Sequence, residues 1–89
     1  MAVYTEDDLK NVQTMKENEI FGAGLRKRLA DHESGMHPFV EGEEEIFIRN
    51  MIQYSENILR LTEDSDMPNG NRMRLRGMIM QMQISIGLG

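Results

Sequence analysis

Three arginines, Arg72, Arg74 and Arg76, stand within five residues near the C-terminal end of the sequence. Guanidinium groups bind phosphate oxygens through two parallel hydrogen bonds, so these residues are candidates for an anion site. In an oligomer, symmetry would bring one such arginine from each copy to a common axis. The alternative is a solvated basic surface that balances the acidic residues at 63–66. The sequence leaves both interpretations open.

The charge of the chain is unevenly distributed. The net charge of −5 argues against binding to duplex nucleic acid through the whole surface. Residues 1–45 have five basic and eleven acidic side chains, whereas residues 46–89 have five arginines and four acids. This asymmetry favours a small anionic ligand. A second hypothesis is an acidic helical protein–protein interaction module that engages a basic host surface through Glu6, Asp7, Asp8, Glu41, Glu43, Glu44 and Glu45.

The sequence shows no motif for catalysis, a cofactor or a metal. Cysteine is absent, which excludes disulfides and thiol chemistry. The glycines at 22–24 lack the remaining residues of a dinucleotide or phosphate-binding loop. His32 and His37 are five residues apart, a poor spacing for a helical metal pair, and we expect both in an exposed loop. We therefore expect a binding protein without a cofactor rather than an enzyme.

Hydrophobic periodicity predicts helices before and after a central loop. A first helical segment is expected over residues 5–31, with Thr5 as its N-cap and the option of a break at Gly22 and Gly24. Residues 32–42 form a loop, and a second helix covers 43–62. The inward face of that helix is expected to consist of Ile48, Met51, Ile52, Ser55, Ile58 and Leu59.

The last segment, residues 71–88, fits both a helical and a strand pattern of apolar residues. We favour a helix, because Met, Gln, Leu and Arg are good helix formers. Such a helix would be apolar over more than half of its circumference, and its methionines would suit either core packing or self-association. A chain of 89 residues buries a thin core, which also favours an oligomer.

The expected architecture is a single all-α domain over residues 1–89. It consists of the N-terminal helical segment and a two-helix antiparallel hairpin, formed by residues 43–62 and 71–88, in an oligomer. No apolar stretch is long enough to cross a bilayer, and the acidic start lacks the features of a signal peptide. We therefore expect a cytoplasmic protein.

The residues from His37 onward resemble a known family, the phage cyclic-oligonucleotide sponges that blunt the bacterial CBASS immune response. These proteins share a helical-hairpin domain with some anti-Thoeris sponges. The resemblance covers about 53 of the 89 residues. It depends on His37-Pro38, Glu41-Gly42, Phe47-Ile48-Arg49, Pro68, Arg74-Leu75 and the run from Met80 through Ser85-Ile86-Gly87.

The resemblance implies a homo-hexamer in the cytoplasm of an infected bacterium, with separate pockets for cyclic dinucleotides and cyclic trinucleotides. Such a protein evades immunity by capturing the messenger, without chemistry. By this likeness His37 and Arg49 would lie near the dinucleotide pocket. Arg74 would lie near the trinucleotide pocket, although the likeness fits Arg72 or Arg76 in that position equally well. Met36 replaces the aromatic residue that the family has before the histidine, so base stacking would fall to Phe39, Phe47 or Tyr54.

Overall fold

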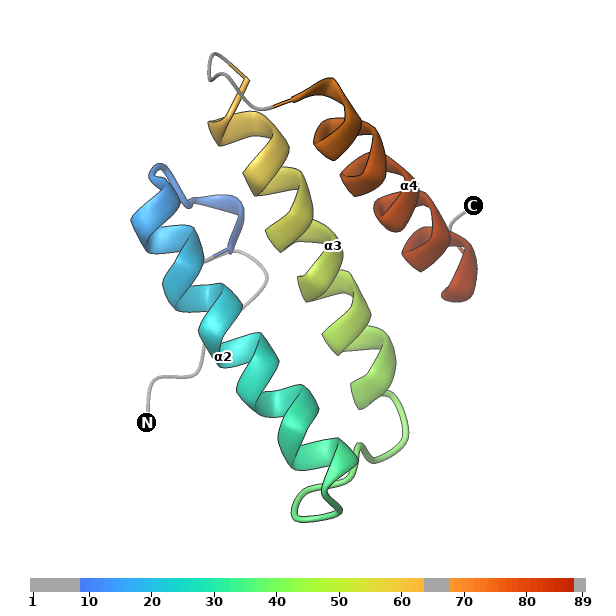
Figure 1. Ribbon diagram of the computed structural model, residues 1–89. Helices are drawn as coiled ribbons and strands as arrows, with labels where there is room; N and C mark the ends of the chain where they lie inside the picture. Colours follow the sequence, from blue (N-terminus) through green and yellow to red (C-terminus); the bar gives the residue numbers. More distant parts are fainter. Residues whose placement is uncertain (1–8, 64–67, 88–89) are drawn as a thin grey trace.

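The computed structural model describes residues 9–63 and 68–87, in which the regular secondary structure is helical and no strand occurs. The described residues contain the helices α2 (Met15–Glu33), α3 (Glu43–Leu61) and α4 (Asn69–Ser85), and residues 9 and 10 are helical as well. Figure 1 shows α3 in the middle, with α2 on one side and α4 on the other, and neighbouring helices running in opposite directions. Both outer helices contact α3. The all-α prediction is confirmed.

The first long helix begins later than the sequence analysis predicted. Residues 11–14 are not helical, and the expected N-cap Thr5 lies outside the described residues. The N-cap of α2 is Thr14, whose hydroxyl oxygen accepts a hydrogen bond of 3.1 Å from the backbone N–H of Glu17. That bond satisfies one of the N–H groups left open in a first helical turn.

The glycines at 22–24 do not interrupt α2, so the break considered from the sequence is wrong. Gly22 is buried, and a Cβ atom placed on it would lie 2.6 Å from the Tyr54 ring of α3. The missing side chain therefore makes room for Tyr54 between the two helices. The contact between α2 and α3 outweighs the low helix propensity of glycine, which costs only about 1 kcal/mol.

A buried amide pair joins α3 to α2 and to the segment before α2. Asn18 and Asn57 are both fully buried. The Nδ2 atom of Asn57 donates to the carbonyl of Leu9 at 2.8 Å and to Oδ1 of Asn18 at 3.1 Å. Asn18 in turn donates to the carbonyl of Tyr54 at 3.2 Å. Arg60 donates to the carbonyl of Val12.

The same segment supplies much of the small apolar core. Leu9 and Val12 are 1% and 2% exposed, and the other buried apolar side chains are Ile52 of α3 and Ile79 of α4. Because this core is small, the hydrogen bonds of Asn18 and Asn57 decide how α2 sits on α3. We call these two residues the amide anchor.

The predicted second helix is confirmed within one residue, since α3 ends at Leu61. It follows Gly42, which has a positive φ of 88°, and its first turn contains Glu43, Glu44 and Glu45. Carboxylates there interact favourably with the positive end of the helix dipole. Ile52 and Ser55 are buried, as the periodicity predicted.

The C-terminal segment is a helix and not a strand as far as Ser85, and 88–89 lie outside the described residues. Ile79 faces the core, whereas four large apolar side chains are at least half exposed. They are Met73, Met78, Met80 and Ile84. The outer side of α4 is therefore apolar and uncovered in the single chain.

We expect Gly22→Ala to destabilise the fold and Gly24→Ala to leave it unchanged or stabilise it. The new Cβ at position 22 would collide with Tyr54, and overpacking of this kind typically costs about 1–3 kcal/mol. Position 24 has open space, and alanine there gains up to about 1 kcal/mol of helix propensity. Urea unfolding of both variants measures the difference. Equal stability of the two would contradict the close approach at Gly22.

We expect Asn57→Ala to cost about 2–4 kcal/mol of unfolding free energy. The change leaves the carbonyl of Leu9 and the side-chain oxygen of Asn18 without their donor in a buried place. Asn71→Ala removes an exposed amide from α4 and serves as the control, with a change within about 0.5 kcal/mol. Thermal unfolding of the two variants, followed by circular dichroism, tests this. A loss as small as that of the control would show that the anchor is dispensable.

Candidate ligand-binding site

The loop between α2 and α3 folds back so that its aromatic residue packs on both helices. The ring of Phe39 stacks on His32 of α2, with centroids 4.1 Å apart and planes 13° from parallel. It also lies 5.2 Å from the ring of Phe47 on α3. The backbone N–H of Phe39 donates to Nδ1 of His32 at 2.9 Å, which fixes the loop against the end of α2. His32 therefore belongs to α2, and the expectation of an exposed loop histidine is wrong for it.

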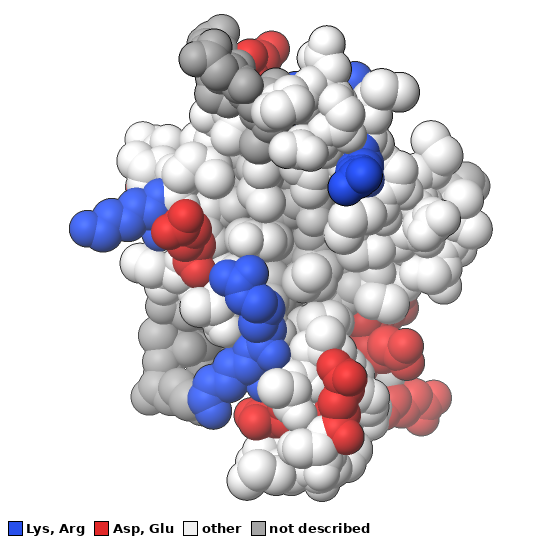
Figure 2. Space-filling model, viewed as in Figure 1, with Lys and Arg blue, Asp and Glu red and all other residues white. Residues whose placement is uncertain are grey.

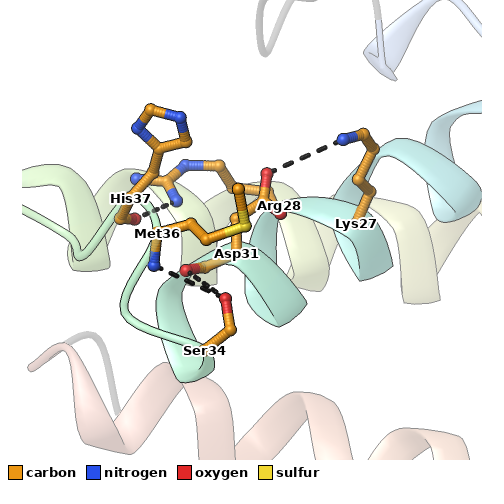
Figure 3. A network of polar contacts seen from close by, with 6 residues as sticks. All are labelled: Lys27, Arg28, Asp31, Ser34, Met36 and His37. Atoms are coloured by element: carbon orange, nitrogen blue, oxygen red, sulfur yellow. Dashed lines mark hydrogen bonds and ion pairs between the residues drawn. The ribbon is translucent and has the colours of Figure 1, made fainter.

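Arg28 of α2 is at the centre of this junction. Its guanidinium carbon lies 4.5 Å from the centre of the Phe39 ring, a cation–π contact. Its Nη1 donates to the backbone oxygen of His37 at 2.6 Å, and its Nη2 lies 3.7 Å from Oε1 of Glu43. Figure 3 shows the guanidinium reaching the His37 carbonyl, while the imidazole ring of His37 points away from this contact. The charge of Arg28 is thus partly balanced within the chain.

Two hollows adjoin Arg28. The first, which we call the aromatic hollow, measures about 180 Å³. It is lined by Leu25, Arg28, Phe39, Glu43, Ile46, Phe47 and Asn50. The second, the loop hollow, measures about 500 Å³ and is lined by Arg28, Asp31, Met36, His37, Pro38, Val40 and Glu43. The two hollows share Arg28 and Glu43.

The structure brings together three of the residues singled out from the sequence and separates the others. Phe39 and Phe47 line the aromatic hollow, and His37 lines the loop hollow beside it. Arg49, expected near His37, lines neither hollow, and its Nη2 donates to Oε1 of Glu45 at 3.0 Å. Tyr54 packs against Gly22 instead of standing open for a base.

The three C-terminal arginines have different environments. Arg72 donates through Nη1 to the carbonyl and hydroxyl oxygens of Thr62 and through Nη2 to the carbonyl of Leu59, each at 3.0 Å. It therefore satisfies carbonyl oxygens at the end of α3 that have no intrahelical partner. Arg74 and Arg76 are exposed and form no hydrogen bond or ion pair with the described residues. Of the three C-terminal arginines, only Arg74 and Arg76 therefore present a charge that no described residue compensates.

The acidic residues at the start of α3 are partly neutralised. Glu43 faces Arg28 at 3.7 Å, and Glu45 is bonded to Arg49. In Figure 2 acidic side chains gather beside the first turn of α3, whereas few charged side chains appear over α4. The internal pairing weakens the case for an acidic docking surface.

Two residues of this junction were not among the predicted site residues: Arg28 was not considered, and His32 was set aside as an exposed loop histidine. They are four residues apart and lie on one face of a helix that continues through the glycines. The predicted helix ended at residue 31, which placed His32 in the loop and obscured that spacing. Asn50 was missed as well, although it lines the aromatic hollow and its side-chain amide has no hydrogen-bond partner among the described residues.

We expect Arg72→Ala to reduce stability by about 1–3 kcal/mol, because hydrogen bonds to a charged group are worth more than neutral ones. Arg76→Ala, with the same change of charge on the same helix, is the control and should shift stability by no more than about 0.5 kcal/mol. Urea unfolding of both variants measures the contrast. A similar loss for both would argue against the capping role of Arg72.

Among the described residues, no cluster of three or more metal-ligating side chains occurs, and no helix is long and apolar enough to span a membrane. Comparisons of the chain with models of known families, with curated proteins and with solved structures found no match. The function is therefore inferred from the geometry and from the sequence resemblance.

Proposed function

We propose that this chain is a non-catalytic binding protein that sequesters cyclic di- and trinucleotides and so blocks CBASS-type signalling in a phage-infected bacterium. The proposal includes self-association, with α3 and α4 as the helical hairpin of the resembled family and a hexamer as the assembly. The observation that supports it most is the pair of exposed arginines on α4 that have no partner among the described residues, next to an uncovered apolar surface.

The apolar surface of α4 has the spacing of a helix–helix interface. Met73, Gly77, Met80 and Ile84 follow one another at intervals of four, three and four residues, which places them on one stripe. The three large side chains are 60–69% exposed, and the space beside Gly77 is open. We call these four residues the α4 stripe. A second copy of the chain would cover it and enlarge the thin core.

Arg74 and Arg76 lie on either side of the α4 stripe, because successive residues turn by about 100° around a helix. The described part of α4 has no acidic residue, so pairing two such helices brings like charges together. An anion bound between the copies would remove that repulsion. The phosphates of a cyclic nucleotide are such an anion, because they present two or three negative charges in a small volume. Binding and assembly would then support each other.

Capture by this mechanism needs no bond to be made or broken. Guanidinium groups pair with the phosphates, while methionine and aromatic side chains pack against the bases. A messenger held in this way is withdrawn from the effector that it would activate. The degree of inhibition therefore depends on the amount of this protein relative to the amount of messenger.

Isothermal titration with a cyclic trinucleotide and a cyclic dinucleotide tests the proposal. The double variant Arg74→Ala/Arg76→Ala should weaken binding of the trinucleotide at least tenfold, since each lost charged hydrogen bond costs about 1.5–3 kcal/mol. Lys16→Ala/Arg26→Ala removes two exposed charges from α2 and is the control, with little change expected.

Light scattering on Met80→Glu checks the assembly, which should dissociate because a charge enters the α4 stripe. Absence of binding by the unaltered chain at tens of micromolar would refute the proposed function. An equal loss in both double variants would show that net charge, and not a site on α4, is responsible.

A further inference from the structure

The aromatic hollow between α2 and α3 lies outside the part of the molecule that the proposed function uses for phosphates. No residue of α4 lines it, and two of its lining residues, Leu25 and Arg28, precede the region that resembles the sponge family. We infer that this hollow is a binding site for one purine base, which stacks on Phe47 and forms hydrogen bonds with Asn50. The inference deepens the proposed function and rests on it for the nucleotide class of the ligand.

The size of the hollow selects a single ring system. Pockets that enclose a drug-sized molecule measure about 300–1,000 Å³. At about 180 Å³ the aromatic hollow is smaller and has room for a base without its sugar and phosphate. The neighbouring loop hollow of about 500 Å³ leaves space for the ribose beyond Arg28.

Phe47 is the aromatic residue of the hollow on which a flat ligand would stack. The rings of Phe39 and Phe47 contact each other, with centroids 5.2 Å apart and planes tilted by 36°. His32 already stacks on the Phe39 ring and Arg28 lies over it, so Phe39 is fixed before a ligand arrives and supports Phe47. Aromatic side chains bind bases of any sequence by stacking, because every base has a π face.

Apart from Arg28, whose guanidinium is already engaged by His37, Phe39 and Glu43, the polar residues of the hollow suit a base better than a phosphate. The side-chain amide of Asn50 can donate and accept at once, as the edge of a purine requires, and no residue in the described part of the chain bonds to it. Glu43 lines the same space, and its Oε1 already accepts a hydrogen bond of 2.8 Å from the N–H of Val40. That carboxylate would repel a phosphate but would accept a hydrogen bond from a base.

The test uses uncharged nucleosides, which cannot exploit the arginines of α4. Adenosine and inosine are titrated into the 15N-labelled full-length chain, and the side-chain amide of Asn50 and the backbone amide of Phe47 are followed by NMR. We expect saturable shifts at these residues, with a dissociation constant in the millimolar range for so small a ligand. Asn50→Ala should weaken this binding at least fivefold, whereas Asn71→Ala, which removes an exposed amide from α4, should not.

Further arms decide between the alternatives. Circular dichroism checks that Asn50→Ala is folded, and Asn50→Asp, which keeps the size but loses the donor, replaces it if it is not. Shifts produced by ribose 5-phosphate instead of the nucleosides would overturn the inference in favour of an anion site. NMR shifts at these residues that depend on protein concentration and not on nucleoside would overturn the inference, because a second copy of the chain would then occupy the hollow.

The inference and the proposed function fail separately. Cyclic nucleotide binding that is unaffected by Asn50→Ala, together with no response to nucleosides, refutes the base site and leaves the proposed function standing. Nucleoside binding at Asn50 without any binding of cyclic nucleotides refutes sequestration and supports the base site. No response to either class of ligand refutes both.

Discussion

The fold depends on the burial of two asparagine side chains that must satisfy each other. Asn57 of α3 has no contact with solvent, so its amide has to find partners inside the protein. It finds them in the carbonyl of Leu9 and the side chain of Asn18, and this ties three segments together. Such bonds are directional, whereas apolar contacts in a small core allow helices to slide. The amide anchor therefore sets the register of α2 against α3.

That register also determines the aromatic hollow. Asn18, Gly22, Leu25 and Arg28 recur every three or four residues along α2, so one stripe of this helix faces α3 and the loop. The hydrogen bonds of Asn18 and the contact of Gly22 with Tyr54 set the position of α2. In that position Arg28 lies over the Phe39 ring, and His32, one helical turn further along α2, stacks on the same ring. A shift of α2 by one turn would remove both contacts. The position of Arg28 in the candidate site thus depends on the hydrogen bonds of Asn18, about ten residues earlier in α2.

The sequence predicted the elements whose signals are local. The apolar spacing around Ile52 and Ser55 predicted α3, and the helix-forming residues of 71–88 decided between helix and strand correctly. The start of α2 was predicted wrongly although a signal exists, since Thr14 and Glu17 have the spacing of a capping box. The break at the glycines failed for another reason. Helix propensity is local, whereas the space that Gly22 leaves for Tyr54 depends on a residue 32 positions away.

The candidate site was only partly predictable because it combines distant residues. The likeness to the sponge family drew attention to His37, Phe39 and Phe47, which do meet near Arg28. It could not separate Arg72 from its neighbours, because all three arginines look alike in the sequence. The difference arises from the end of α3, where unpaired carbonyl oxygens attract the nearest guanidinium.

The position of α3 limits how one ligand can use both parts of the proposed site. α2 and α4 lie on opposite sides of α3 (Figure 1), and the aromatic hollow is lined by residues of α2, α3 and the loop between them and by none of α4. A small cyclic nucleotide can therefore contact both only if a second copy supplies one of them. Otherwise the chain has two independent sites, one built within a single chain and one completed by assembly. In the first case the removal of Asn50 and the removal of Arg74 would weaken binding of the same ligand. In the second case each removal would weaken binding only at the site that contains the residue.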